Sequence, residues 1–476
     1  MNIIRSPCRE LWFCAALGGS DRYNFVYSYF KVQIIPTEFL RTRFEREDAM
    51  DCIATYMNVC RATLCRLIKA WRDSPFMFLL TAGLFTCFLF TRPIAIAAPH
   101  PGPPASGDGS ARAEKSPSPA DISHAIALAG AYLERACGPD GKFTYQVNTI
   151  SGRPSRSYNV VRHAGAIYAL AMLDQAHPDQ QAADAMLRAA IYLHRNYVGQ
   201  GVRPGMLEVW AQPSGKGSNA DLGATGLGLV ALAAVKKTDP DSIPIEQLQA
   251  LGRFLLFLQN ADGSFINRYN ADTGPVADSD ILYYPGEAAL GLLSLYELDH
   301  SQIWLNAASK ALAYLANSTK KLTVVPADHW ALIATAKLLP YCEHVGCPVS
   351  REDLLHHASQ ICVSILRDQI SNPAIPSVDG AFDTEGRTTP TATRMEGLLA
   401  ALEFLPLGQQ RTEVKTSVDR GIAFLLRSQV VSGWYAGGLP GESPLLAPGA
   451  SEIRIDYVQH ALCAWLRYQR LLDGSR

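Results

Sequence analysis

Residues 251–265 (LGRFLLFLQNADGSF) carry the pattern that decides the fold. Apolar side chains recur at i, i+3 and i+4 along the first nine of these residues, which predicts a helix with one buried face. Gly263 then ends the helix in a turn, and the aromatic ring of Phe265 can fold back onto it. The same order returns at residues 129–143 (AGAYLERACGPDGKF) and 421–434 (GIAFLLRSQVVSGW). The chain is therefore a helical repeat.

A second kind of helix alternates with the first and is apolar around most of its circumference. Such helices are usually buried on nearly every face. Further helices of the first kind, near residues 182–196, 304–316 and 352–367, complete six pairs. The helices of the second kind are expected at residues 163–173, 221–235, 287–298, 329–339, 396–405 and 460–472.

Six helical hairpins predict an all-α fold, the (α/α)6 barrel or toroid, in which the second helices form an inner ring and the first helices an outer ring. A repeat array must cap its end faces or close on itself. Six pairs is the number at which α/α barrels close, and an open solenoid is the alternative. No break in the repeat marks another domain, so we expect a single toroid domain over residues 120–476.

Residues 1–98 differ in character and are interpreted as an N-terminal extension with a signal segment. The apolar run 76–90 (FMFLLTAGLFTCFLF) follows a basic stretch and precedes the small residues 95–97 (AIA). These are the parts of a secretory signal, with an uncleaved signal anchor as the alternative. Residues 99–119, rich in Pro, Gly and Ser, predict a flexible linker. We therefore expect a periplasmic or secreted bacterial protein, or one anchored in the inner membrane.

The composition of the chain argues against nucleic acid as a partner. The chain of 476 residues is 48% hydrophobic and carries a net charge of −1, without the concentrated basic surface that nucleic-acid binding requires. We expect a monomer that binds no nucleic acid and touches a membrane only through an uncleaved signal anchor. Cys342 and Cys347 are close enough to form a disulfide in an oxidising compartment, and buried free thiols are the alternative.

The repeat resembles those of known toroid families. Residues 252–265 are spaced like the QW repeat of terpenoid cyclases, and residues 424–434 echo it. Over residues 120–476 the architecture is also similar to protein prenyltransferase β subunits and to six-hairpin glycosidases. The segments RHAG, YYPGEA, DHW, TPTATRMEG and RIDYVQH resemble a family of exported bacterial toroid proteins. These resemblances imply the fold and leave the chemistry open.

Each second helix has a titratable residue near its N-terminus, and in a barrel with parallel inner helices these residues surround one mouth. The positive ends of the helix dipoles point to the same mouth. Carboxylates beside His and Arg provide groups for general acid–base catalysis, although caps and ion pairs are the structural alternative. The expected catalytic residues are Glu287, Glu396, His163 and Asp456. The expected substrate-binding residues are Arg162, Tyr158, Asp221, Tyr284, Asp328, His329, Trp330, Arg394, Arg454 and His460.

Two reactions on a poly- or oligosaccharide fit an exported toroid. Glycoside hydrolysis needs two carboxylates, for which Glu287 and Glu396 are the favoured pair, with Asp221, Asp328 and Asp456 as alternatives. A lyase or epimerase acting on a uronic acid would use His or Tyr as the base and Arg to neutralise the carboxylate. The pairs that suit this reaction are His163 with Arg162 and Tyr284 with Arg394. The sequence leaves both reactions open.

Other functions fit the residues less well. Terpenoid cyclases of the QW type need a DxDD motif, and this chain has only Asp278-Ser279-Asp280 followed by Ile281. Prenyltransferases bind zinc through Asp, Cys and His, and no Cys occupies the position that would match Asp456 and His460. A metal site is a further alternative, since His and carboxylate side chains suit several divalent ions, and its residues would be His163, Glu287, His329, Glu396 and His460. No contiguous ligand motif supports it, so we expect no cofactor and no metal. The alternative to an enzyme is a non-catalytic toroid that binds a glycan, a peptide or a partner protein in the cell envelope.

Overall fold

A computed structural model of the chain describes residues 9–17, 26–34, 117–200, 202–212, 219–276, 281–342, 349–372, 374–445 and 451–474. The chain divides into two compact units, Met1–Ser110 and Ala111–Arg476. In the first unit, β1 (Arg9–Leu17) pairs antiparallel with β2 (Val26–Ile34). The predicted signal run 76–90 and most of the predicted linker lie outside the described residues.

The described part of the second unit contains twelve α-helices that alternate between two rings, as the repeat predicts. The helices of the outer ring are α4 (Pro119–Ala136), α6 (Gln180–Tyr197), α8 (Ile245–Leu258), α10 (Gln302–Thr319), α12 (Arg351–Asp368) and α14 (Gln409–Ser428). The helices of the inner ring are α5 (Val160–Ala176), α7 (Leu222–Thr238), α9 (Tyr284–Asp299), α11 (His329–Leu338), α13 (Thr388–Ala401) and α15 (Ile455–Gly474).

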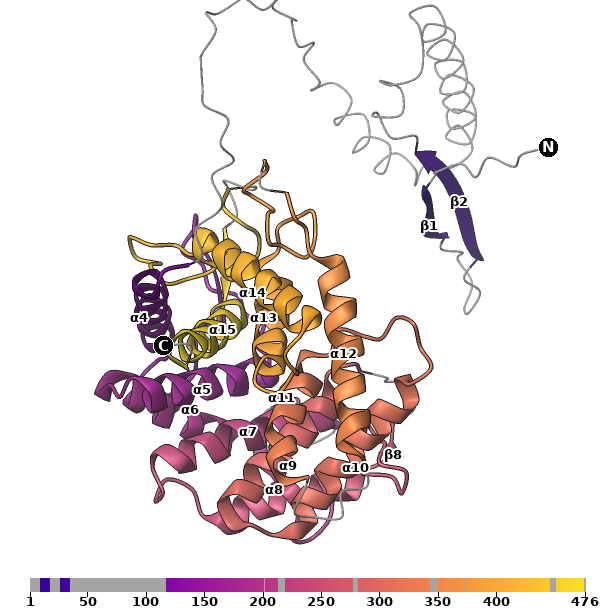
Figure 1. The fold of residues 1–476 in the computed structure, drawn as a ribbon. Helices are drawn as coiled ribbons and strands as arrows, with labels where there is room; N and C mark the ends of the chain where they lie inside the picture. The colour runs from indigo at the N-terminus through magenta and orange to yellow at the C-terminus, as the bar shows by residue number, and fades with distance from the viewer. Residues whose placement is uncertain are drawn as a thin grey trace, which may run out of the picture. The chain divides into compact units, whose positions relative to one another are not determined.

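The inner ring is closed. Going round it, α5 packs on α7, α7 on α9, α9 on α11, α11 on α13, α13 on α15, and α15 returns to α5. In the outer ring, the last helix α14 contacts the first helix α4, and Figure 1 shows the first and last hairpins side by side. The (α/α)6 toroid is therefore confirmed, and the open solenoid is excluded.

The two helix types differ in burial as their sequences predict. In α7 every residue from Leu222 to Val235 is buried, because this helix has neighbours on all sides. In α6 the buried residues Ala182, Ala185, Met186 and Ala189 follow a spacing of three or four, and most of the exposed residues of this helix are polar. An outer helix thus needs only one apolar stripe.

The turn after α8 shows why glutamine and glycine recur at the ends of outer helices. Gln259 follows α8 and donates from Nε2 to the backbone oxygen of Ala307 in α10 at 2.9 Å. Gly263 has φ +94°, and a Cβ there would lie 2.2 Å from the backbone oxygen of Lys310. Glycine is required at this position because the turn and the next outer helix touch backbone to backbone.

The same contact, from a glutamine side chain to a backbone oxygen, joins other outer helices and links the last of them to the first. Gln369 donates to the backbone oxygen of Ser417 at 3.0 Å, which joins α12 to α14. Gln429 donates to the backbone oxygen of Ala125 at 3.0 Å, which joins α14 to α4. The QW-like spacing is therefore a structural device that links successive outer helices, including the last to the first.

Short strands lie just before several inner helices. The strand β9 (Glu452–Arg454) leads directly into α15 and pairs with β3 (Gln146–Asn148) from the first hairpin. The strand β6 (Asn219–Asp221) leads into α7 and pairs with β7 (Arg268–Asn270), which in turn pairs with β8 (Gly274–Pro275). A fourth ladder joins β4 (Val198–Gly199) and β5 (Glu208–Val209). These ladders fix the loops that surround the N-terminal ends of the inner helices.

The described cysteines include three buried free thiols, Cys137, Cys362 and Cys463. Cys347 lies outside the described residues, so the predicted pair with Cys342 stays a prediction. None of the helices in the described ranges is both long enough and apolar enough to cross a membrane.

Candidate active site

A cavity of about 470 Å³ lies at the N-terminal ends of the inner helices. All six inner helices contribute to its lining, so these helix starts do face one mouth of the barrel. Each inner helix contributes at least one lining residue. These residues include Arg162 of α5, Leu227 of α7, Glu287 of α9, His329 of α11, Arg394 of α13 and His460 of α15.

Three side chains from consecutive inner helices meet in the wall of this cavity. Glu396 Oε1 lies 2.5 Å from Nδ1 of His460. The rings of His329 and His460 stand nearly perpendicular, at 77°, with their centroids 5.7 Å apart. Gly397 allows α13 to approach α11 at this point, because a Cβ there would lie 2.9 Å from Cα of His329. Both imidazoles line the cavity, whereas Glu396 is fully buried behind them.

His329 is buried, and neither of its ring nitrogens has a hydrogen-bond partner among the described residues. The ring of Tyr283 stands edge-on to it at 5.0 Å and that of Trp330 lies at 4.8 Å. Burial lowers the pKa of His329 well below its ordinary value, and the positive charges of His460 and Arg394 lower it further. His329 is therefore a neutral imidazole whose two nitrogens make no hydrogen bond within the described residues.

Glu287 also has an unsatisfied atom in the cavity. It is buried, and its Oε2 has no hydrogen-bond partner among the described residues. Burial raises the pKa of Glu287 well above its ordinary value, and the charge of nearby Asp328 raises it further. The side chain is thus held as a neutral carboxylic acid that can donate a hydrogen bond.

Asp456 is fixed between two arginines. Its Oδ2 lies 3.0 Å from Nε of Arg162. Arg454 grips it with two nitrogens, Nε at 2.6 Å from Oδ1 and Nη2 at 3.1 Å from Oδ2. Both carboxylate oxygens of Asp456 are therefore occupied by guanidinium groups.

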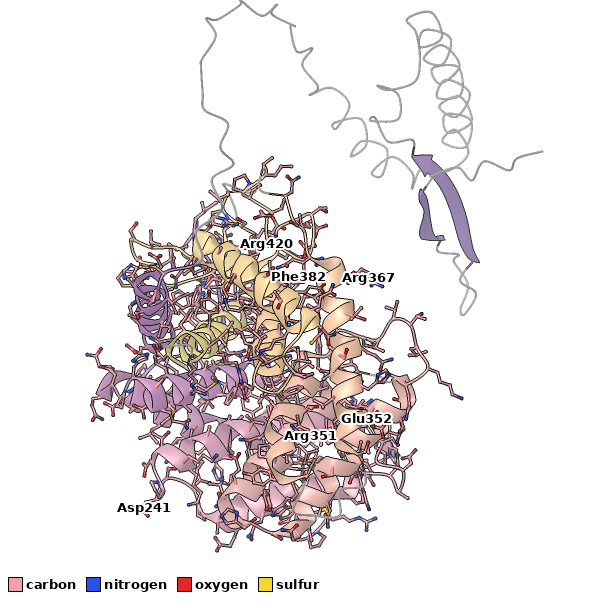
Figure 2. All side chains as sticks on the ribbon, viewed as in Figure 1. Asp241, Arg351, Glu352, Arg367, Phe382 and Arg420 are labelled. Atoms are coloured by element: carbon pink, nitrogen blue, oxygen red, sulfur yellow. The ribbon has the colours of Figure 1, made fainter. Side chains whose placement is uncertain are left out.

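Arg394 is held in place by contacts with uncharged groups. Its Nη1 donates to the backbone oxygen of Pro390 at 3.0 Å. Its guanidinium carbon lies 5.1 Å from the ring centre of Phe382, a residue labelled in Figure 2. Its Nε is buried without a hydrogen-bond partner, and none of the ion pairs among the described residues includes Arg394.

His163, a predicted catalytic residue, does not line the cavity. Its Nδ1 lies 2.7 Å from the hydroxyl of Tyr158, and its Nε2 lies 2.9 Å from the backbone oxygen of Ala189 in α6. Burial lowers the pKa of His163 to about 4. The structure places His163 and Tyr158 in a satisfied contact between α5 and α6.

Three other predicted residues lie beside the cavity rather than in its lining. Asp221 accepts a hydrogen bond from Nε of Arg268 at 2.7 Å, and Tyr284 lies close to this ion pair. Asp328 caps α11 by accepting from the backbone nitrogen of Ala331 at 3.1 Å, and burial raises its pKa to about 7. Asp221 and Asp328 therefore have structural roles, the first in an ion pair and the second as a helix cap. Their positions at helix starts already suggested such roles.

The cavity also contains residues that were not predicted. Arg387, Thr389, Thr393 and Gln459 line it. The first three fall in or just before the segment TPTATRMEG, whose unusual run of Thr and Arg at the start of an inner helix is the signal available in the sequence. Arg387 is paired with Asp383 at 3.1 Å.

One group among the described residues has the composition of a metal site. The ligand atoms of His329, Glu396 and His460 all lie within 4.8 Å of one another, and imidazole with carboxylate suits several divalent ions. The neighbouring charge of Arg394 opposes such an ion, for the same reason that it lowers the pKa of His329. The same three groups can instead act on a neutral or anionic ligand as acids and bases.

The opposite end of the barrel differs in its electrostatics. A second cavity, of about 310 Å³, is lined there by residues from the C-terminal parts of inner helices. Its Lys337 lies 2.7 Å from Glu297, which also pairs with Lys237. Both carboxylates of this cavity, Glu297 and Glu403, are paired with basic residues, whereas Glu287 of the N-terminal mouth has an oxygen without a hydrogen-bond partner among the described residues.

No protein-family model matches this sequence, and no curated protein matches it. Solved structures do resemble it in fold. Cellobiose 2-epimerase from Bacillus thermoamylovorans B4167 is 11% identical, with a TM-score of 0.57 over 74% of this chain and 99% of that one. An unsaturated glucuronyl hydrolase specific for heparin is 13% identical, with a TM-score of 0.51 over 75% and 99%.

A third similar structure holds a saccharide. It is an inactive variant of an α-1,6-mannanase of Salegentibacter sp. HEL1_6 in complex with α-1,6-mannotriose, 13% identical, with a TM-score of 0.50 over 74% of this chain and 99% of that one. At these identities the likeness shows the fold alone. The predicted resemblance to six-hairpin glycosidase folds is confirmed.

Proposed function

We propose that this protein is a carbohydrate-active enzyme that moves a proton on its substrate, by epimerisation, isomerisation or elimination. The observation that carries the proposal is the pair of imidazoles in the cavity, His329 and His460, with ring centroids 5.7 Å apart. Two acid–base groups that both line one cavity can take a proton from a substrate carbon and return one. Imidazole is the side chain best suited to both roles near neutral pH.

The two imidazoles have different surroundings and therefore different roles. We assign His329 as the proton acceptor, because its nitrogens have no partner among the described residues and it is unprotonated before the reaction. His460 is held through Nδ1 by the carboxylate of Glu396, which leaves Nε2 for the substrate. Protonated His460 is the donor in this assignment, and Glu396 is a positioning residue.

A hydrolytic mechanism with two carboxylates has less support. Such a mechanism needs one protonated and one ionised carboxyl group on either side of the scissile bond. Glu287 supplies the neutral acid, but Asp456 is gripped by two arginines and Glu396 is bonded to His460. Glu287 is therefore assigned to bind a substrate hydroxyl by donating a hydrogen bond.

A saccharide ligand is supported by the lining of the cavity and by the similar structures. Tyr283, Trp330 and Tyr457 present aromatic surface to it, and a volume of about 470 Å³ lies in the range of small-molecule sites. The named activities of the similar structures concern cellobiose, unsaturated glucuronyl groups and α-1,6-mannan. A non-catalytic toroid would have no need of an orphaned neutral His329 beside an orphaned Glu287.

The proposal includes export to the periplasm or the outside of the cell. Its support is the basic stretch, the apolar run 76–90 and the residues AIA at 95–97. Cell fractionation followed by N-terminal sequencing of the mature protein tests it. A new N-terminus near Ala98 is expected, and a protein found only in the cytoplasm with its N-terminus intact would contradict export.

The enzymatic proposal is tested by incubating the full-length protein with a panel of neutral and acidic oligosaccharides and following the products by NMR. We expect an epimer, an isomer or an unsaturated sugar from the wild type. His460→Asn should abolish the product, while His177→Asn, at an exposed histidine bonded to Gln469, should not. Release of reducing ends as the sole reaction would show a hydrolase instead. Activity lost to a chelator and restored by a divalent ion would make His329 and His460 metal ligands and overturn their acid–base roles.

A further inference from the structure

The charges that face the cavity are unbalanced. Among the described residues, four arginines line it, together with two carboxyl groups, those of Glu287 and Asp456. Asp456 is shared by Arg162 and Arg454, so one negative charge offsets two positive ones.

Helix dipoles add to this excess. Six inner helices direct their N-terminal ends to the cavity, and each helix N-terminus carries a partial positive charge. Arg387 is compensated by Asp383 and Glu385, both at 3.1 Å. The lining therefore favours a ligand with negative charge.

Arg394 is the arginine of this lining that no carboxylate compensates among the described residues. Its backbone contact with Pro390 and its position over the ring of Phe382 hold the guanidinium in place. Its Nε is buried and unsatisfied. A buried donor without a partner is costly, and a bound anion would compensate the positive charge of this guanidinium group. The planar guanidinium matches a carboxylate with two parallel hydrogen bonds.

We infer that the substrate is an acidic saccharide, a uronate, whose carboxylate binds Arg394. This inference rests on the proposed function and names the substrate class for the same cavity. Arg394, His329 and Tyr283 line the same cavity, so a carboxylate bound to Arg394 shares that cavity with the proposed proton acceptor.

The bound carboxylate also selects the carbon that reacts. A proton on the carbon that bears the carboxylate becomes more acidic when an arginine neutralises that group. His329 takes this proton, and the C–H electron pair moves into the carboxylate to form an enediolate that Arg394 stabilises. Protonated His460, from the same wall of the cavity, then returns a proton to this carbon, and return to the opposite face after the planar enediolate has turned in the cavity gives the epimer. Where the neighbouring carbon carries a leaving oxygen, the same electron pair forms a C=C bond and expels that oxygen, which takes the proton.

The test measures binding by isothermal titration calorimetry with the full-length chain. The ligands are a glucuronate, a galacturonate and a mannuronate oligosaccharide, their neutral parent sugars, and a sulfated and a phosphorylated neutral sugar. We expect the uronates to bind at least tenfold more tightly than the neutral parents. Arg394→Gln should weaken the uronates about tenfold to a hundredfold and leave the neutral sugars unchanged. Arg394→Lys should restore part of the loss.

Arg253→Gln is the matched control, since Arg253 lies in the outer helix α8 and donates to the backbone oxygen of Gly205. It should bind all ligands like the wild type. Equal affinity for acidic and neutral sugars, or uronate binding unaffected by Arg394→Gln, would overturn the inference, as would tighter binding of the sulfated or phosphorylated sugar. Uronate binding through Arg394 without any turnover would contradict only the enzymatic proposal. Turnover of neutral sugars that ignores Arg394→Gln would contradict only the inference.

Discussion

Glu396 Oε1 lies 2.5 Å from Nδ1 of His460, and the two residues come from neighbouring inner helices, α13 and α15. The carboxylate is fully buried, whereas the imidazole lines the cavity. A buried group that fixes one nitrogen of a histidine decides which nitrogen faces the substrate. Glu396, buried in the barrel wall, therefore positions His460, the proposed proton donor.

This relationship predicts different effects for the two glutamates near the cavity. Glu396→Gln should lower turnover about tenfold to a hundredfold, because an amide cannot support the charge of His460. Glu287→Gln should retain most of the turnover, since burial already keeps Glu287 neutral and an amide also donates a hydrogen bond. Steady-state kinetics of both variants provide the check. The reverse order of effects would assign the general acid to Glu287 and support hydrolysis.

His329→Phe should lower the activity without lowering the stability of the fold. The imidazole is buried with both nitrogens unsatisfied among the described residues, and an apolar ring of similar shape removes that cost. We expect turnover to fall at least about a hundredfold, while thermal unfolding shows stability unchanged or higher by about 1 kcal/mol. A loss of stability together with activity would indicate a structural role for His329.

His163 should contribute to acid sensitivity of the fold. Its pKa is about 4 in the folded chain, against an ordinary value of 6.5. Between these values the unfolded chain binds a proton that the folded chain does not, so stability falls as the pH falls through this window. The full loss is about 3 kcal/mol. Urea unfolding from pH 7.5 to 4 should show a shallower decline for His163→Gln than for the wild type. Parallel curves would mean that His163 takes up its proton without unfolding.

Gly437→Ala should weaken the closure of the ring. Gly437 has φ +89°, and a Cβ there would lie 1.8 Å from the backbone oxygen of Leu128 in α4. The variant must therefore move the turn after α14 away from the first outer helix, at a cost of about 3 kcal/mol or more. Gly433→Ala, in the same turn and with a similar φ of +80° but no atom within 4 Å of the added Cβ, is the control for chemical denaturation. Equal midpoints for the two variants would contradict this account of the closure.

The fold could be predicted from the sequence because its determinants are local and repeated. The stripe of α8, the glycine at 263 and the all-round apolar α7 each follow from their own residues. Closure followed from the count of six pairs. The strand pairing of β3 with β9 could not be predicted, because it joins the first and last hairpins through only three residues each.

The site was predictable only in part, for a physical reason. Helix periodicity places polar residues near the mouth, and this brought Glu287, His329 and His460 to the cavity as expected. It does not reveal which of them finds a partner. His163 bonds to Ala189 of α6, and Asp221 bonds to Arg268 of β7, and both contacts depend on elements distant in the sequence. The sequence therefore predicted which end of the barrel holds the cavity. The structure was needed to show which of these side chains have hydrogen-bond partners and which have none among the described residues.

Solvent deuterium exchange shows directly whether the protein moves a proton on the sugar carbon that bears the carboxylate. The full-length protein is incubated in D₂O with a uronate oligosaccharide that it binds, and the sugar is analysed by NMR and mass spectrometry. The account predicts deuterium at the carbon bearing the carboxylate, in the epimer or in recovered substrate, and no incorporation with His329→Phe. In an eliminating enzyme the same carbon loses its hydrogen to the double bond. A wild-type protein that converts the sugar while that carbon keeps its original hydrogen would contradict proton transfer at this site.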